Sequence, residues 1–134
     1  MINQDRKKMI KFLLDTNVVI WLSKDDPRIN QIKSLLISDE TQVFISAVSW
    51  WEIAIKIRTG KLQIDLNMLR FLAKNHNYLE LPMSSEYMRA YLELPNLHKD
   101  PFDHMLLAQA ITCPMRLITG DSRLAEYSSL VMMI

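Results

Sequence analysis

The chain has 134 residues, the size of one domain and too few for two independent hydrophobic cores. Its hydrophobic share of 49% and charged share of 23% are those of a globular protein, which argues against a disordered chain. Sixteen basic and fifteen acidic side chains give a formal charge of +1. Any binding of nucleic acid would therefore depend on local basic patches and not on net charge.

The N-terminal residues 1–8 are polar and show no hydrophobic periodicity. We expect them to be a flexible extension ahead of a single domain over residues 9–134, with Met9 as a candidate natural start. The apolar run that follows, over residues 9–22, is interrupted by polar and charged side chains, and no cleavage-site pattern comes after it. We therefore expect no signal peptide and no membrane association, and a cytoplasmic protein.

Short apolar runs alternate with stretches of helical periodicity along the rest of the chain. A short continuous apolar run is typical of a strand buried on both faces, as in a parallel sheet. The expected strands cover residues 9–14, 43–45, 78–81, 115–118 and 130–134. The expected helices cover residues 27–37, 47–58, 66–74, 85–92 and 101–112. This alternation indicates βαβ units, so the predicted fold class is α/β with a central parallel sheet flanked by helices.

The expected helix over residues 47–58 lacks a single apolar face, because its apolar side chains point in every direction. A helix that is apolar all round is either deeply buried or carries a second contact surface. In so small a domain we interpret that surface as a subunit or partner interface. Gly60 follows the helix at the position where a left-handed cap is common. The one cysteine, Cys113, excludes an internal disulfide and is interpreted as a small buried hydrophobe at a helix end.

Two aspartates directly follow apolar strands. Asp15 ends the run Leu13-Leu14, and Asp121 comes after the run that closes with Gly120. A carboxylate at the carboxyl end of a buried parallel strand lies where open α/β sheets bind their ligands. Each aspartate fits equally well as the N-cap of the helix that follows it. Gly120 permits either a close approach of another group to the backbone or a positive φ.

Two further acids lie on expected helices. Glu52 is the one acid in a helix lined with Trp and Ile, and an acid in such surroundings needs a partner, for which a metal ion qualifies. Its alternative partner is Lys56, one turn later, in a solvated ion pair of a few tenths of a kcal/mol. Asp103 falls in the first turn of the last long helix, where Asp100 is a good N-cap and Pro101 suits the first helical position. Both roles can hold together, with Asp100 capping the helix and Asp103 in a site.

The predicted topology brings these four carboxylates to one edge of the sheet. Several carboxylates packed together cannot all ionise unless a positive group joins them, so without one at least one acid should have a raised pKa. A hard divalent cation such as Mg²⁺ meets that need. We hypothesise that Asp15 and Asp103 hold the principal metal, and that Glu52 and Asp121 orient water or complete a second, weaker site.

In these stretches the chain resembles the PIN-domain ribonucleases, and specifically the VapC-type toxins of bacterial toxin–antitoxin pairs. The resemblance covers about residues 9–133 and rests on four motifs in the family's order. They are LLDTN at 13–17, SAVSWWEIAIK at 46–56, HKDPFD at 98–103 and LITGD at 117–121. The resemblance implies a PIN-like three-layer fold, Mg²⁺ or Mn²⁺ as cofactor, RNA as substrate, a cognate antitoxin protein and a homodimer. It also implies an acidic site at Asp15, Glu52, Asp103 and Asp121, with Asn17 and Thr119 as polar support.

The chain departs from the family pattern at two positions. His104 stands where many relatives have arginine, so a phosphate contact there is expected to be weaker or pH-sensitive. Trp50 stands where a small residue is usual, which bears on the dimer or partner surface. Either Trp50 or Trp51 is a candidate to stack on a base, although core packing explains at least one of them. The candidate RNA contacts are Arg58, Lys61, Lys99, His104 and Arg123, each with the simpler interpretation of a solvated surface charge.

The residues and the resemblance together predict a metal-dependent endoribonuclease that uses water as nucleophile and leaves 5′-phosphate ends. One alternative is a phosphatase of the haloacid-dehalogenase type, which also begins with a strand ending in aspartate. That chemistry requires a second acid two residues later, where this chain has Asn17. The alternative from another class is a non-catalytic PIN-like binding module. The presence of all four carboxylates argues against it, and a metal titration separates the two.

Overall fold

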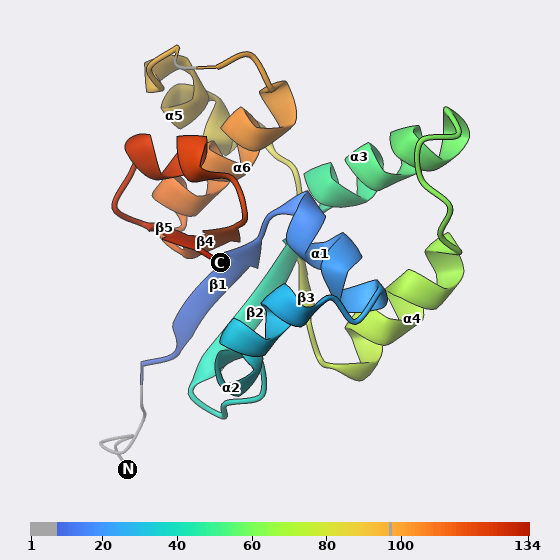
Figure 1. The fold of residues 1–134 in the computed structure, drawn as a ribbon. Coiled ribbons are helices and arrows are strands. Elements are labelled where there is room, and N and C mark those ends of the chain that lie inside the picture. The colour runs from blue at the N-terminus through green and yellow to red at the C-terminus, as the bar shows by residue number, and fades with distance from the viewer. Residues whose placement is uncertain (1–7, 97) are drawn as a thin grey trace.

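The structure, a computed structural model, describes residues 8–96 and 98–134. Its five described strands form one parallel sheet in the order β3-β2-β1-β4-β5, with helices on both faces (Figure 1). The strands are β1 (Ile10–Leu14), β2 (Thr41–Ser46), β3 (Leu79–Leu81), β4 (Arg116–Thr119) and β5 (Val131–Met133). The predicted α/β fold with a central parallel sheet is confirmed, and the strand boundaries lie within two residues of the predicted ones. Most of the expected N-terminal extension, residues 1–7, lies outside the described residues.

The long helices follow the sequence prediction closely. Helices α3 (Ala47–Arg58) and α6 (Pro101–Thr112) have the predicted bounds, and α4 (Leu66–Asn75) is one residue longer than predicted. Helix α1 (Thr16–Ser23), which begins directly after β1, was not among the expected helices. Gly60 follows α3 with a φ of +76°, as the predicted left-handed cap requires. No helix in the described part of the chain is long and apolar enough to cross a membrane.

Two predicted helices are wrong as single α-helices. The stretch 27–37 is a 3-10 helix, η1 (Pro27–Gln31), followed by a short α2 (Lys33–Leu36). Ile32 separates them with φ −122° and ψ 6°, outside the helical region, and packs into the core together with Ile29. Two core residues three apart suit the three-residue repeat of a 3-10 helix. The second stretch, 85–92, is divided into η2 (Ser85–Tyr87) and α5 (Met88–Glu93). The segment after Asp121 forms the 3-10 helix η3 (Ser122–Glu126).

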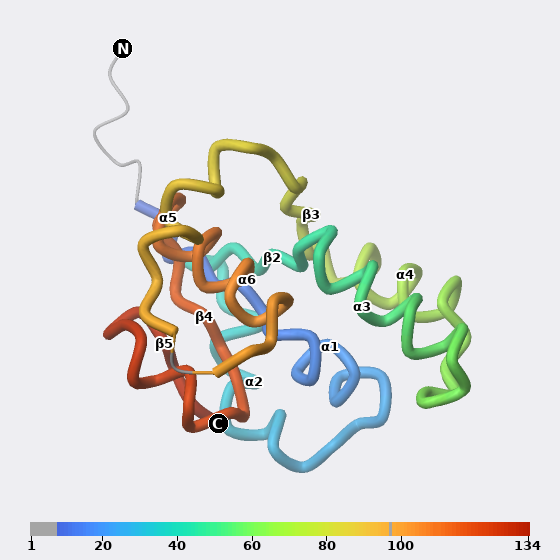
Figure 2. The backbone as a smooth tube through the Cα atoms, turned by 90° about the horizontal axis from the view of Figure 1, so that it is seen from above, coloured from blue at the N-terminus to red at the C-terminus, as the bar shows by residue number. Residues whose placement is uncertain are grey.

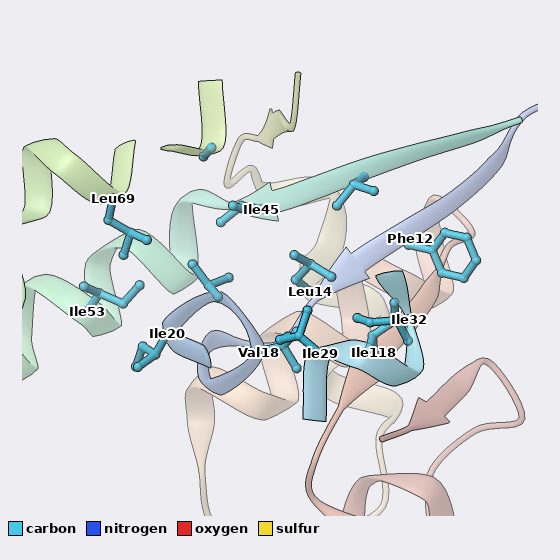
Figure 3. Close-up of a cluster of buried hydrophobic side chains, with 13 residues drawn as sticks. Phe12, Leu14, Val18, Ile20, Ile29, Ile32, Ile45, Ile53, Leu69 and Ile118 are labelled. Atoms are coloured by element: carbon cyan, nitrogen blue, oxygen red, sulfur yellow. The ribbon is translucent and has the colours of Figure 1, made fainter. Parts of the chain in front are cut away.

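The sheet separates two hydrophobic cores, as the continuous apolar strands require. Phe12 and Leu14 of β1 point into a core covered by α1, η1 and α3 (Figure 3). Leu13, between them, points to the opposite face and packs with α6 and η3. Because β1 is the central strand and is buried on both faces, the residue that follows it is held in a fixed position.

Helix α3 has one buried face and one exposed face. Its buried side chains include Val48, Ser49, Glu52 and Ile53, while Trp50 packs partly against the core. Trp51 is 63% exposed and makes an edge contact with Phe102, with ring centroids 5.3 Å apart. A large exposed aromatic beside an apolar groove is consistent with the predicted second contact surface on this helix.

Candidate active site

Several chain segments begin at the carboxyl edge of the sheet, and each starts with a side chain that caps its backbone. Asp15 caps α1, Ser46 caps α3, Asp100 caps α6 and Asp121 caps η3. Helix α3 contacts both α1 and α6, and Figure 2 shows these three helices around the end of β1. The four predicted acids therefore lie on elements that meet at one place.

Asp15 is fixed from two sides and is 3% exposed. Its Oδ1 accepts a hydrogen bond from the backbone N–H of Thr16 at 2.7 Å, and its Oδ2 accepts one from the hydroxyl of Thr119 at 2.7 Å. Burial raises the pKa of Asp15 to about 6, against these hydrogen bonds, which lower it. The charges of Glu52 and Asp100 raise it further. Two hydrogen bonds thus hold the carboxylate, and among the described residues no positively charged group contributes to the shift of its pKa.

Glu52 has the predicted partner, but the ion pair is only partly solvated, since the Lys56 side chain is 33% exposed. Lys56 Nζ lies 3.4 Å from Glu52 Oε2, and the Glu52 side chain is only 12% exposed. Its other oxygen, Oε1, is buried and has no hydrogen-bond partner among the described residues. Nearby, the hydroxyl of Thr16 donates to Ser49 Oγ at 3.0 Å, tying α1 to α3. One carboxylate oxygen of Glu52 is therefore left without a partner in the interior.

Asp103 has the most unfavourable environment of the four acids. Asp100 caps α6 as predicted, because its Oδ1 accepts from the backbone N–H groups of Phe102 and Asp103 at 3.0 and 3.3 Å. Asp103 is 8% exposed. Its pKa is raised to about 8, first by burial and then by the neighbouring carboxylates. These are Asp15, Asp100, Glu52 and Asp121, in decreasing order of effect.

Asp121 differs because it is already paired. Arg123 Nη2 lies 2.6 Å from Asp121 Oδ2, and the Arg123 backbone N–H donates to Oδ1 at 2.9 Å. The hydrogen bonds from the Arg123 side chain hold the pKa of Asp121 below its ordinary value. Asp121 N–H in turn donates to Thr119 Oγ1 at 3.0 Å. Thr119 therefore links Asp15 and Asp121, as a polar support between the two strand-end acids.

The residue between them, Gly120, allows a close approach and not a positive φ. A Cβ at this position would lie 2.2 Å from Cη2 of Trp21, a distance that no real side chain could keep. Trp21 also lies under the guanidinium of Arg28, 3.6 Å from the ring centroid. The indole of α1 thus packs directly onto the backbone beside Asp121, and glycine is required there for steric reasons.

Sequence reasoning missed a group of aromatic rings beside the acids. His98 and His104 stack with centroids 5.0 Å apart, and both contact Tyr127. The His98 side chain is 8% exposed, and its Nε2 lies 3.8 Å from Asp103 Oδ2. One ligand-type atom from each of His98, Asp103 and Asp121 lies within 4.8 Å of the others. The sequence did place His98 near the site, because this residue belongs to the motif HKDPFD and stands two residues before the capping Asp100.

Some of the predicted RNA contacts are exposed, and others are bonded to side chains of this chain. Arg58, Lys61 and Lys99 are exposed. Arg123 is exposed but paired with Asp121. His104 is not available as a phosphate contact, because its Nε2 lies 3.0 Å from the Tyr127 hydroxyl. Burial and the neighbouring His98 lower its pKa.

The remaining residues singled out in the sequence have other surroundings. Asn17 is exposed on the first turn of α1. Trp51 lines an apolar groove of about 440 Å³ between α3, α5 and α6. Trp50 lines a different hollow of about 420 Å³, against α4. Cys113 is half-buried at the end of α6, where its Sγ lies 4.0 Å from the hydroxyl of Tyr87, so it is less buried than predicted.

Comparison with known proteins gives concordant results. A family model described as PIN domain matches residues 12–130. The chain is 26% identical over 121 residues to Ribonuclease VapC22 of Mycobacterium tuberculosis, covering 89% of this chain and 93% of that protein. It is similar to VapBC2 from Rickettsia felis bound to a DNA fragment from their promoter, with a TM-score of 0.71 and 15% identity over 93% of this chain and 98% of that one. A toxin-antitoxin complex from Klebsiella pneumoniae gives a TM-score of 0.67 and 18% identity over 90% and 95% of the two chains.

Proposed function

Because this chain belongs to the PIN-domain family, we propose that it is a metal-dependent endoribonuclease of the VapC type, acting as the toxin of a toxin–antitoxin pair. The observation that carries the proposal is the environment of Asp103, a buried carboxylate that four neighbouring acids disfavour as an anion. An arrangement of this kind is costly to fold, and such clusters concentrate at functional sites. The relative named Ribonuclease VapC22 supports RNA as the substrate.

The residues present fit a hard divalent cation. Oxygen ligands from carboxylates suit Mg²⁺ and Mn²⁺. Burial and neighbouring carboxylates raise the pKa of Asp15 and of Asp103, and Glu52 Oε1 has no hydrogen-bond partner among the described residues. In the proposal Asp15 and Asp103 hold the principal ion, while Glu52 and Asp121 complete the site or orient water. When bound, the metal would supply positive charge to the phosphate oxygens and favour ionisation of a water molecule.

The chain itself contributes positioning. The hydroxyl of Thr119 and the N–H of Thr16 fix both oxygens of Asp15, so this carboxylate needs little reorganisation when it binds. In the proposal Glu52, whose Oε2 is paired with Lys56, takes a proton from the attacking water. In the proposed reaction a bond forms between water oxygen and phosphorus, the bond from phosphorus to O3′ breaks, and O3′ takes a proton. The products carry a 5′-phosphate and a 3′-hydroxyl.

We propose that Arg58, Lys61 and Lys99 contact the RNA backbone, since they are exposed cations. The proposal no longer includes His104, which is bonded to Tyr127. Arg123 contributes only if it leaves Asp121. The supporting role of Asn17 stays part of the proposal through its place on the first turn of α1.

Two protein partners also belong to the proposal. Solved structures of toxin–antitoxin complexes with the same fold support a cognate antitoxin. The exposed Trp51 and its apolar groove support a homodimer, which sedimentation over a range of concentrations would test. A cytoplasmic location follows from the same functional assignment and is proposed with it.

The decisive experiment is cleavage of a mixed RNA pool by purified, antitoxin-free protein in EDTA, Mg²⁺ or Mn²⁺. We expect cutting that needs the metal and is lost in Asp15→Asn, while the charge-matched control Asp39→Asn, in an exposed turn, cuts normally. End analysis should find 5′-phosphates, and 2′,3′-cyclic phosphates would contradict the use of water. If the folded protein binds neither ion in a titration and cuts nothing, the proposal fails in favour of a binding module. The family match leaves no support for the phosphatase alternative.

A further inference from the structure

The side chain of His98 is buried beside the acids, and one of its ring nitrogens has no hydrogen-bond partner among the residues that the structure describes. Nε2 is fully covered and lies 3.8 Å from Asp103 Oδ2, which is too long for a hydrogen bond. A buried polar atom without a partner is unfavourable, and such atoms are rare in folded proteins. The position of this nitrogen therefore needs an explanation.

The rest of the ring is firmly held, which determines where its proton lies. His98 Nδ1 accepts a hydrogen bond from the backbone N–H of Asp100 at 3.2 Å, and the His98 backbone N–H donates to the hydroxyl of Tyr127 at 3.0 Å. The ring stacks on His104. Since Nδ1 is the acceptor, the proton of the neutral ring is on Nε2, the nitrogen that faces Asp103.

This tautomer decides between two roles for His98. The closeness of His98, Asp103 and Asp121 is compatible with a metal bound partly through nitrogen. A histidine that binds a metal through Nε2 must have its lone pair there and usually donates its Nδ1–H to an acceptor. Here Nδ1 faces the N–H of Asp100, so that arrangement would bring two protons together.

We infer that His98 is a positioning residue that donates its Nε2–H to the Asp103 carboxylate, and that it is not a metal ligand. The inference rests on the proposed function, because the orientation of Asp103 affects the reaction only if Asp103 holds the metal. In this proposal the distance between Nε2 and Asp103 Oδ2, now 3.8 Å, shortens to that of a hydrogen bond when the site binds its ion. It then fixes one oxygen of Asp103 and leaves the other for the ion.

The first test reads the tautomer directly, in protein with ¹⁵N-labelled histidine and without metal. Long-range ¹H–¹⁵N spectra distinguish Nε2–H from Nδ1–H, and the signals of the three histidines are assigned by substitution. We expect Nε2–H for His98, a signal that moves in Asp103→Asn and not in Asp39→Asn. Addition of diamagnetic Mg²⁺ should move it further while the proton stays on Nε2. An Nδ1–H form, or transfer of the proton to Nδ1 on adding Mg²⁺, would overturn the inference.

The second test is Mn²⁺ binding by calorimetry. His98→Asn can keep an acceptor for the Asp100 N–H but has no donor that reaches Asp103, and we expect its affinity to fall about 10–100-fold, the usual effect of losing a supporting contact. His98→Gln places an amide N–H near the position of Nε2 and should restore most of that loss. His76→Gln, at the exposed end of α4, is the histidine control. Equal losses in both His98 variants would show a merely structural role and contradict the inference.

The two proposals fail separately. If wild-type protein binds neither Mg²⁺ nor Mn²⁺, the proposed nuclease function is wrong, whereas the response of the His98 signal to Asp103→Asn still decides whether these two side chains are paired. If metal binds normally but His98 has the Nδ1–H form, only the present inference is wrong.

Discussion

We expect Asp103→Asn to stabilise the metal-free protein, and to do so most at high pH. Asp103 is 8% exposed, and burial together with its acidic neighbours raises its pKa to about 8. An aspartate in the unfolded chain ionises near pH 3.9. The folded protein must therefore either keep a proton on Asp103 or tolerate a buried charge, and asparagine keeps the shape without that cost.

The direction of the pH dependence follows from the raised pKa. The folded state binds a proton that the unfolded chain has released, so the wild-type protein suffers no penalty below about pH 4 and loses stability as the pH rises to about 8. A tenfold change in proton affinity corresponds to about 1.4 kcal/mol, which sets an upper limit of roughly 6 kcal/mol at pH 8 and above. Relaxation of the site and entry of water reduce the penalty, and we expect a gain of about 2–3 kcal/mol.

The assay is thermal unfolding followed by circular dichroism in EDTA, at pH 5 and pH 8.5. The expected gain corresponds to a rise in Tm of roughly 10 °C at pH 8.5. At pH 5 it should fall below about 1 kcal/mol. Asp39→Asn should change Tm little at either pH, since Asp39 is exposed. A metal that binds the site should stabilise the wild-type protein and have little effect on Asp103→Asn. If Asp103→Asn is less stable than wild type at pH 8.5 in EDTA, its charge is already compensated and the reasoning is refuted.

Two further predictions concern the contacts that hold the site. Thr119→Val removes the donor to Asp15 Oδ2 and should weaken Mn²⁺ binding about 10–100-fold in calorimetry. The control is Thr112→Val, which loses only a hydrogen bond to the Ala108 carbonyl. Equal effects of the two substitutions on Mn²⁺ affinity would contradict the prediction. Gly120→Ala should lower the free energy of unfolding in urea by about 1–3 kcal/mol, because its Cβ would overlap Trp21. Adding Trp21→Leu should recover part of that loss, and strictly additive losses would argue against the steric explanation.

The elements that the sequence predicted well are those whose local signals agree with their tertiary environment. Helix α6 begins with Asp100 and Pro101, a cap and a first-turn residue that both favour a helix start, and its bounds match the prediction. The strand ending at Leu14 is apolar throughout because both of its faces are buried. The stretch 27–37 failed because the spacing of its apolar residues does not distinguish an α-helix from two short helical turns.

Placement of the acids at one edge was predictable from topology, but their individual states were not. Asp121 is exposed enough to pair with Arg123 two residues later, whereas Asp103 faces other acids. Nothing in the sequence shows which of these two aspartates has the higher pKa. The same is true of His104, whose bond to Tyr127 joins residues 23 positions apart. Contacts of that range depend on the packing of η3 against α6, which no local pattern specifies.

The capping and functional interpretations of the aspartates proved to be compatible, and the reason is geometric. In a parallel sheet the helices begin where the strands end, so their N-termini gather at the carboxyl edge. Asp15 caps α1 with Oδ1 while Oδ2 is held by Thr119, and Asp100 caps α6 while Asp103 faces the other acids. The unpaired N–H groups of these helix starts favour negative charge. They therefore lower the cost of gathering carboxylates at this edge, though not enough to return the pKa of Asp103 to its ordinary value. The proposed divalent cation would therefore bind where the pKa of a carboxylate is still raised.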